Sequence, residues 1–183
     1  MSMFTIAGAP TIEEGDMELI FSQTVTSGTL ASFSTGTLAT GFKGLIIDTV
    51  ARTDSASGVG GSFTIQINGD TTASNYQTTY TVGTTSVSSF VYTQGFFSGH
   101  NTGGAGAGFY QAYRSRLLGH EGTSNYKTWN SQGTGHGSTT SSVWYSATYA
   151  GTWKNTDAIT SIVLVPASGE LVTGSSIAVY GLK

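Results

Sequence analysis

The stretch DAITSIVLVPASGELVTGSSIAVYGLK, residues 157–183, decides the fold. Its apolar run at 159–165 is rich in β-branched residues and too short for a helix, which predicts a strand buried on most of its surface. Pro166 ends that strand because proline cannot donate a hydrogen bond to a sheet. Gly169 and Gly174 supply the flexible corner that leads into a return strand.

The return strand alternates between two faces. Ile177 and Val179 share one face, and Ala178 and Tyr180 share the other, because successive side chains of a strand point to opposite sides. A domain that ends on a core strand is closed by its own C-terminus, so we expect no tail that carries a separate activity.

Short strands of the same kind are predicted upstream. In the clearest, at 62–68, Phe63, Ile65 and Ile67 face inward, and the strand ends in a turn at Asn68-Gly69-Asp70. The others are expected at 18–26 and 30–34, as a hairpin turned at Ser27-Gly28, and at 42–52, 76–82, 87–92, 109–118 and 143–153, with loops at 95–108 and 119–140. About nine strands joined by Gly/Ser/Thr turns predict an all-β fold, a jelly-roll-like antiparallel β-sandwich. A trimeric up-and-down or interdigitated β-structure is the alternative.

Composition narrows the class of protein. The 183 residues correspond to one domain, and the 0 Cys exclude disulfides, thiolate catalysis and cysteine metal sites. Only 9% of residues are charged, against roughly 25% in an average soluble domain, which suits a surface largely covered by neighbours. The net charge of -3 gives no electrostatic footprint for nucleic acid. No apolar run approaches the roughly 20 residues of a membrane helix, and no basic signal region precedes Lys43.

The first residues are not patterned as a strand or a helix, so the chain divides into an N-terminal arm at 1–16 and a β-sandwich domain at 17–183. A frayed terminus is one interpretation of the arm. The other is an extended segment that lies on a partner subunit through Met3, Phe4 and Ile6, whose apolar side chains would otherwise be left in solvent. The arm also carries an acidic cluster, Glu13, Glu14 and Asp16.

No recognised phosphate or metal pattern is present. The glycine run at 103–108 lacks the G-x-G-x-x-G spacing and a following helix, so we expect a mobile loop. The three histidines all lie beside glycine in loop-like sequence and are expected at the surface; one histidine repeated around a trimer axis is the alternative metal site. They are His100, His120 and His136.

Catalysis is not predicted either. Hydrolysis needs a nucleophile with a base, or two facing carboxylates, and no G-x-S-x-G element occurs. We therefore expect no enzyme, no catalytic residue and no cofactor, and we interpret Asp70 as a turn residue. A hydrolase of cell-surface polymer is an alternative that would depend on a carboxylate such as Asp70 or Glu121.

Aromatic residues are densest between residues 110 and 153. Packing in the core and at subunit interfaces accounts for them, since strand alternation already places about half of them on one face. The alternative is an exposed pair, Tyr126 with Trp129, that binds glycan, because aromatic rings stack on sugars and anchor interfaces.

The order of the turn and core motifs resembles that of small β-sandwich virion proteins of tailed bacteriophages. The motifs are LIIDTVART at 45–53, SFTIQINGD at 62–70, Asn75-Tyr76, AITSI at 158–162, Gly174-Ser175-Ser176 and VYGL at 179–182. The resemblance covers residues 17–183; the family pattern has an aromatic or leucine in place of Ile65 or Ile67 and a glycine near Thr72, where this chain departs from it.

The resemblance implies a structural role. We expect a capsid decoration (cement) protein, made in the host cytoplasm and located on the capsid surface of the virion. It would work as a homo-oligomer, a homotrimer, that contacts major capsid protein and its own copies, with no nucleic acid, membrane or cofactor. The alternative is a tail or fibre receptor-binding module that recognises host-surface glycan.

Overall fold

The computed structural model describes residues 17–55, 62–83, 87–92, 95–98, 110–136 and 144–183. The strands are β1 (Met17–Thr24), β2 (Thr29–Leu30), β3 (Phe33–Ser34), β4 (Gly44–Ala51), β5 (Phe63–Ile67), β6 (Tyr76–Gly83), β7 (Val87–Tyr92), β8 (Phe96–Ser98), β9 (Gln111–Leu118), β10 (Lys127–His136), β11 (Trp144–Trp153), β12 (Ile162–Pro166), β13 (Leu171–Val172) and β14 (Ser176–Leu182). A short 3₁₀ turn, η2 (Ala73–Asn75), lies between β5 and β6. Over these ranges, no helix has the length and hydrophobicity to cross a membrane.

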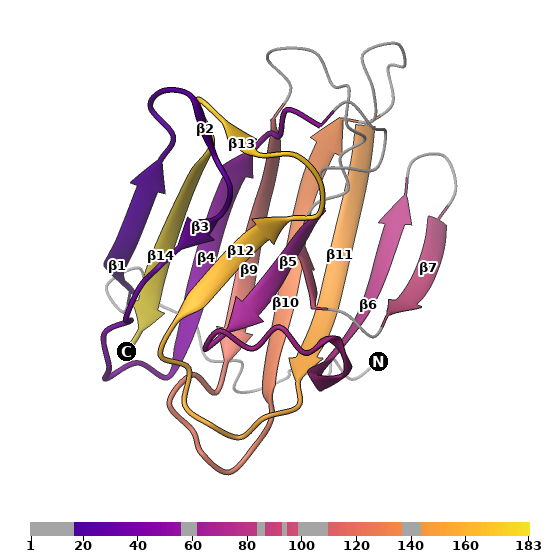
Figure 1. Cartoon of the computed structure of the whole chain (residues 1–183). Helices are drawn as coiled ribbons and strands as arrows, with labels where there is room; N and C mark the ends of the chain where they lie inside the picture. The colour runs from indigo at the N-terminus through magenta and orange to yellow at the C-terminus, as the bar shows by residue number, and fades with distance from the viewer. Residues whose placement is uncertain (1–16, 56–61, 84–86, 93–94, 99–109, 137–143) are drawn as a thin grey trace, which may run out of the picture.

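Two antiparallel sheets form a sandwich (Figure 1). The large sheet has the order β1-β14-β4-β9-β10-β11-β6-β7 and the small sheet the order β3-β12-β5-β8. If β1, β3, β4, β5, β8, β9, β12 and β14 are counted as the first to eighth strands, the sheets read 1-8-3-6 and 2-7-4-5. That is the strand order of a jelly roll, so the predicted jelly-roll β-sandwich is confirmed.

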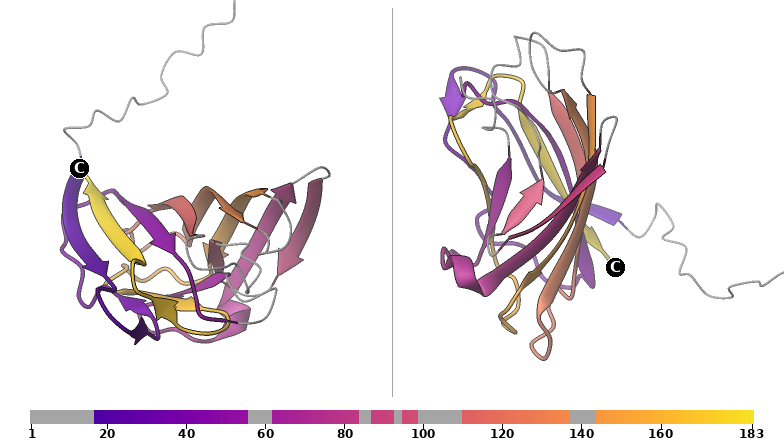
Figure 2. Two further views of the ribbon diagram at one scale, coloured as in Figure 1. Left: turned by 90° about the horizontal axis from the view of Figure 1, so that it is seen from above. Right: turned by 90° about the vertical axis from the view of Figure 1, so that its right-hand side faces the viewer.

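Two hairpins are inserted into this jelly roll. The β6–β7 hairpin lies in sequence between β5 and β8, and the β10–β11 hairpin lies between β9 and β12. Both join the large sheet beyond β9, where β11 pairs with β6 from residue Trp153 opposite Tyr76 to Ser146 opposite Gly83. The large sheet is therefore twice as wide as the small one and curves around it (Figure 2).

The core lies between the sheets and follows from period-two alternation. On β5, the predicted inward residues Phe63, Ile65 and Ile67 are all buried. On β14, Ile177 and Val179 are buried, as predicted. The other buried members come from both sheets and include Phe33, Leu45, Ile47, Leu117, Ile162 and Leu164.

The hairpin predicted at 18–34 is wrong. The chain does turn at Gly28, with φ +66°, but β1 pairs with β14 and β2 pairs with β13. A local turn signal does not determine whether the flanking segments pair with each other. Here each segment finds a more apolar partner from the C-terminal stretch.

The loop predicted at 119–140 is also wrong over residues 127–136, which form β10 in the middle of the large sheet. Only Trp129 among the inward residues of this strand is a large apolar side chain; Lys127, Ser131 and Gly133 share its face. Hydrogen bonding to β9 and β11 on both sides, rather than hydrophobic alternation, specifies this strand.

The C-terminal stretch has the predicted strands, but they do not lie in one sheet. β12 belongs to the small sheet and β14 to the large one, and positive φ at Gly169 (+72°) and Gly174 (+92°) turns the chain between them. In β12 alternate residues are buried rather than the whole strand, and Pro166 is its last residue. The predicted loop at 95–108 begins with β8; residues 99–108 lie outside the described ranges.

Candidate functional site

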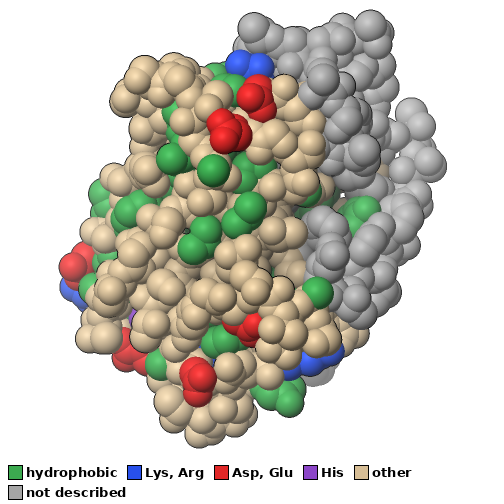
Figure 3. All heavy atoms as spheres, viewed as in Figure 1, with side chains coloured by type: hydrophobic (Ala, Val, Ile, Leu, Met, Phe, Trp, Pro, Cys, Tyr) green, Lys and Arg blue, Asp and Glu red, His purple; other side chains and the backbone are tan. Residues whose placement is uncertain are grey.

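The outer face of the large sheet is the surface that points away from the small sheet. It carries the even-numbered residues of β4, β9, β10, β11 and β14, because the odd-numbered ones face the core. Among the described residues, no second layer of strands packs on this face (Figure 2). By contrast, the opposite side of the sandwich is formed by the small sheet and shows few charged side chains, mostly towards its ends (Figure 3).

Large apolar side chains gather on the outer face. Four large hydrophobic residues are exposed in the described ranges, and three of them lie here: Leu19 (55% exposed), Val50 (41%) and Leu118 (44%). They lie on β1, β4 and β9, within the jelly-roll part of the sheet, and Ile46 and Tyr180 lie opposite each other between them. Exposed apolar residues that share one face mark an interaction surface more clearly than scattered ones.

Two arginines stand among these apolar residues. Arg114 on β9 makes a bidentate ion pair with Asp48 on β4. The Nε–Oδ1 and Nη2–Oδ2 distances are 2.8 and 2.7 Å. The hydrogen bond to Asp48 raises the pKa of Arg114. Arg116 is two residues further along the same face of β9 and is exposed. It has no ion-pair partner in the part of the chain that the structure describes.

Side-chain amides from the neighbouring strand complete this cluster. Asn130 lies opposite Arg116 and Gln132 lies opposite Arg114. A shallow hollow of about 390 Å³ lies between the arginines and the amides, and Ile46 also lines it. A second hollow, of about 400 Å³, lies on the other side of Arg114, over Val50 and Ala112. Both are open depressions of a flat face, which suits a macromolecular partner better than an enclosed small ligand.

Beyond this cluster the outer face becomes uncharged. The outward side chains of β10, β11 and β6 are small or amide-bearing: Thr128, Asn130, Gln132, Thr134, Ser146, Thr148, Ala150, Thr152, Gln77, Thr79 and Thr81. We call this region the threonine half of the outer face, and the β1, β14, β4 and β9 region the apolar half.

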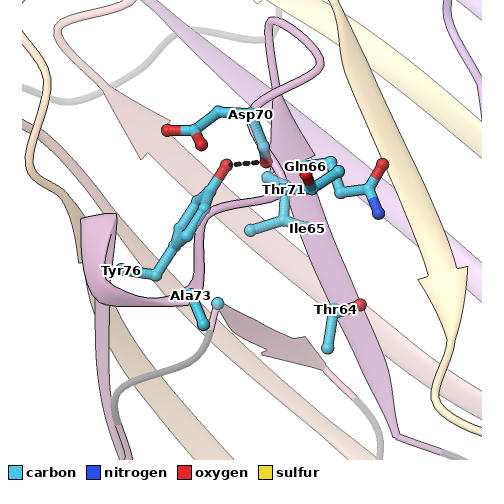
Figure 4. Close-up of a pocket in the computed structure, with 8 residues that line it drawn as sticks. Thr64, Ile65, Gln66, Asp70, Thr71, Ala73 and Tyr76 are labelled. Atoms are coloured by element: carbon cyan, nitrogen blue, oxygen red, sulfur yellow. Dashed lines mark hydrogen bonds between the residues drawn. The ribbon is translucent and has the colours of Figure 1, made fainter.

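The corner at Asp70 also contains a hollow, with a volume of about 190 Å³ (Figure 4). The Asp70 carboxylate accepts hydrogen bonds from Trp153 Nε1 and Asn75 Nδ2, both 2.8 Å, and from the Thr72 amide at 2.9 Å. Burial acts to raise the pKa of Asp70, but these hydrogen bonds outweigh it and hold that pKa below its ordinary value. The Tyr76 hydroxyl donates to the Asp70 carbonyl oxygen, and burial raises its pKa to about 12.

Asp70 is therefore a turn residue, as predicted. Its carboxylate is ionised and fully engaged in holding the corner, and Asn68 and Gly69 take the positive φ angles of +54° and +72° that the turn requires. The Glu121 carboxylate accepts hydrogen bonds from the Gly41 and Phe42 amides, so it too holds a loop in place.

A buried cation, Lys127, lies where the loop between β9 and β10 ends and β10 begins. Lys127 Nζ donates to the carbonyl oxygens of Gly122, Asn125 and Thr156, the last two at 3.0 Å. Desolvation lowers the pKa of Lys127. The surface position predicted for His120 is wrong, since its side chain is 1% exposed and its Nδ1 lies 3.4 Å from the Phe42 carbonyl oxygen.

The alternative of an exposed pair of aromatics, Tyr126 with Trp129, is wrong for Trp129. Tyr126 is 57% exposed in the same loop, but Trp129 is only 3% exposed. Trp129 points into the core, where its ring lies 6.2 Å from Phe97 and 6.4 Å from Tyr76, centroid to centroid. Alternation along β10, missed in the sequence, decides this. Core packing is the role of Trp129.

Several predicted residues fall outside the described ranges. These are the arm residues Met3, Phe4 and Ile6, together with His100 and the glycine run at 103–108. His136 is the last residue of β10, where only the backbone is described.

We did not predict Arg114, Arg116, Asn130 or Gln132 as site residues from the sequence. The Arg-x-Arg spacing on a predicted strand was a usable signal, but Asn130 and Gln132 become its neighbours only if 127–136 is recognised as a strand.

Across the described residues, no group of three or more histidine or acidic side chains is placed to hold a metal ion. No protein family model, curated protein or solved structure matches this chain.

Proposed function

We propose that this protein is a structural virion protein of a tailed bacteriophage that decorates and stabilises the capsid as a homo-oligomer. The observation that carries the proposal is the outer face, where three exposed large hydrophobic residues and two arginines share one side of the large sheet. Arginine is enriched at protein–protein interfaces, and their buried parts are more apolar than the rest of a protein surface.

The size of the face suits this role. Seven neighbouring strands at about 4.8 Å spacing and about eight residues at 3.4 Å give a surface of roughly 34 by 27 Å. That is roughly 900 Å², about the area that one partner contributes to a standard interface of about 800 Å² per side. A decoration subunit works by adding such contact area across joints between capsid subunits, which internal genome pressure would otherwise open.

Capsids that lack this protein provide the test. Purified protein should co-sediment with them to saturation at hundreds of copies per particle, and Leu19→Asp or Val50→Asp should weaken binding at least tenfold because each places a charge in the apolar half of the face. Tyr126→Asp is the matched control, since it charges an exposed hydrophobic residue outside that face. A handful of copies per virion, or full binding by both face variants, would contradict capsid decoration.

Glycan recognition is a second candidate because Tyr126 remains exposed in the loop between β9 and β10. A tail or fibre module would bind host-surface glycan there, with Tyr126 as the stacking ring. Saturable binding on a glycan array, lost in Tyr126→Ala, would support this role over capsid decoration.

A further inference from the structure

The cluster of Arg114, Arg116, Asn130 and Gln132 is built to receive an acidic group. Arg116 and Asn130 are direct cross-strand neighbours, as are Arg114 and Gln132, so two guanidinium groups and two amides border one hollow. Guanidinium groups bind carboxylates through two parallel hydrogen bonds, and amide NH₂ groups add further donors.

One of the two guanidinium groups in the cluster has no counter-charge among the described residues. Asp48 neutralises Arg114, whereas Arg116 is exposed and lacks an ion pair to any described residue. The cluster therefore carries a formal charge of about +1 on a protein whose net charge is -3. A carboxylate-bearing segment of protein fits this surface better than a neutral one.

The sequence itself contains such a segment. Residues 1–16 include Glu13, Glu14 and Asp16 and contain no lysine or arginine. We propose that this acidic segment of a second copy docks on the outer face, with its carboxylates on Arg116 and the neighbouring amides. The inference rests on the proposed function only in that both require self-association, and it names the surface and the segment that provide it.

The distance from β1 favours a second copy over the same chain. β9 lies three strands from β1, about 14 Å at a spacing of 4.8 Å. An extended backbone covers at most about 3.5 Å per residue, so from Met17 it carries Asp16 and Glu14 no further than about 4 and 11 Å. Within one chain the backbone at these two positions would stop over β14 and β4. Arg116 lies beyond β4, and it is two residues away along β9 from Leu118, which shares a row of paired residues with Met17. A neighbouring copy has no such limit.

The apolar residues of the same segment can contact exposed apolar side chains on the outer face. Ile6 precedes Glu13 by seven residues, which span up to about 25 Å when extended. Val50 lies on the strand next to Arg116 and Leu118 lies two residues further along β9, so both are within that reach. Burial of Phe4 or Ile6 on these exposed side chains would add hydrophobic stabilisation to the ion pairs.

Self-association of the purified full chain, without capsids, tests the charge pairing. Arg116→Glu should weaken association about tenfold by light scattering after gel filtration, because reversal turns an attraction into a repulsion. The double variant Arg116→Glu with Glu14→Arg should recover most of the loss, and Lys154→Glu, a charge reversal outside the apolar half, should have no effect. Wild-type association should also weaken between about 0.01 and 1 M NaCl, as the Debye length falls from about 30 to 3 Å.

Cross-linking identifies the chain that supplies the segment. The protein has 0 Cys, so Glu14→Cys in one preparation and Asn130→Cys in another introduce one thiol each. Mixing them under mild oxidant should give a disulfide-linked heterodimer, whereas Glu14→Cys mixed with Thr152→Cys should not. Absence of the heterodimer, an intrachain disulfide in the double variant, or self-association unaffected by Arg116→Glu would each overturn the inference. Capsid co-sedimentation of the wild type tests the proposed function separately, so the two failures are distinguishable.

Discussion

The jelly-roll strands of the large sheet and the two hairpins added to them build their inner faces differently. The jelly-roll part presents aliphatic side chains to the core, with Leu45, Ile47 and Val179 on adjacent strands. The added part presents Trp129, Tyr149 and Trp153 next to glycine, serine and a buried lysine. One part is held by aliphatic packing of both sheets. The other depends on a few large rings and on hydrogen bonds that satisfy buried polar groups.

Glycine makes room for the rings in the added part. Gly151 lies opposite Trp129, and a Cβ atom at position 151 would overlap the indole ring. Nearby, Tyr80 stacks on Tyr149 with ring centroids 5.1 Å apart, and Tyr113 meets Tyr149 edge-on at 6.1 Å. In the added part of the large sheet, aromatic rings that pack against glycine therefore take the place of the alternating aliphatic side chains found in the jelly-roll part.

The largest effect is expected from Trp129→Ala. Removal of a buried indole should lower the free energy of unfolding by about 4 kcal/mol, as for other large aromatic truncations in a core. Tyr126→Ala, three residues away and exposed, should change it by less than about 0.5 kcal/mol. Urea unfolding followed by fluorescence or circular dichroism measures both. A small effect of Trp129→Ala would mean that the added part is not held by its rings.

Lys127→Met should cost about 2 to 3 kcal/mol, because three carbonyl oxygens lose their donor while the methylene stem is retained. Lys154→Met is the control, since Lys154 is exposed at the same open end of the hairpin, directly after Trp153, the residue paired with Lys127. Equal unfolding free energies for the two variants, measured in urea, would show that the hydrogen bonds of Lys127 do not contribute to stability.

Asp70→Asn should cost about 2 kcal/mol, because hydrogen bonds to an ionised carboxylate are stronger than those to an amide. The folded-state pKa is lowered, so the stabilisation is present above the unfolded value of 3.8 and is lost as pH falls through the lower folded value. The gap between wild type and Asp70→Asn should therefore be constant near neutral pH and narrow below pH 3.8. A gap that is the same at about pH 2.5 and about pH 7, which bracket the ordinary aspartate pKa of about 3.9, would contradict this assignment.

The smallest effect is expected at the Arg114–Asp48 pair. Asp48→Asn should lower the free energy of unfolding by less than about 1 kcal/mol, since exposed ion pairs contribute little to stability. If the outer face serves recognition, the same variant should alter self-association more than unfolding. Parallel light-scattering and urea measurements distinguish a recognition role from a structural one.

The same contrast explains what the sequence made predictable. The jelly-roll strands were recognisable because Phe63, Ile65 and Ile67, or Ile177 and Val179, alternate with polar residues. β10 was missed because its inward residues Lys127, Ser131 and Gly133 carry no such signal. The local sequence also does not determine which strands pair, since a turn at Gly28 does not reveal that β1 pairs with β14.

The candidate site was unpredictable for a related reason. The outer face becomes visible only when Arg114 and Arg116 on β9 are placed beside Asn130 and Gln132 on β10 and opposite Asp48 on β4. Each of these residues taken alone resembles an ordinary solvated polar position. Whether they lie together depends on strand register, which the periodicity of a single sequence does not determine.

The pairing of β1 with β14 has a consequence for the timing of assembly. Leu19 from β1 and Tyr180 from β14 are cross-strand neighbours, so the outer face is incomplete until residues 176–182 have been synthesised and have closed the sheet. Such long-range closure is slow compared with local hairpin formation. A nascent chain therefore cannot present the complete outer face, and the strands that pair with β14 keep unpaired edges until β14 has been made.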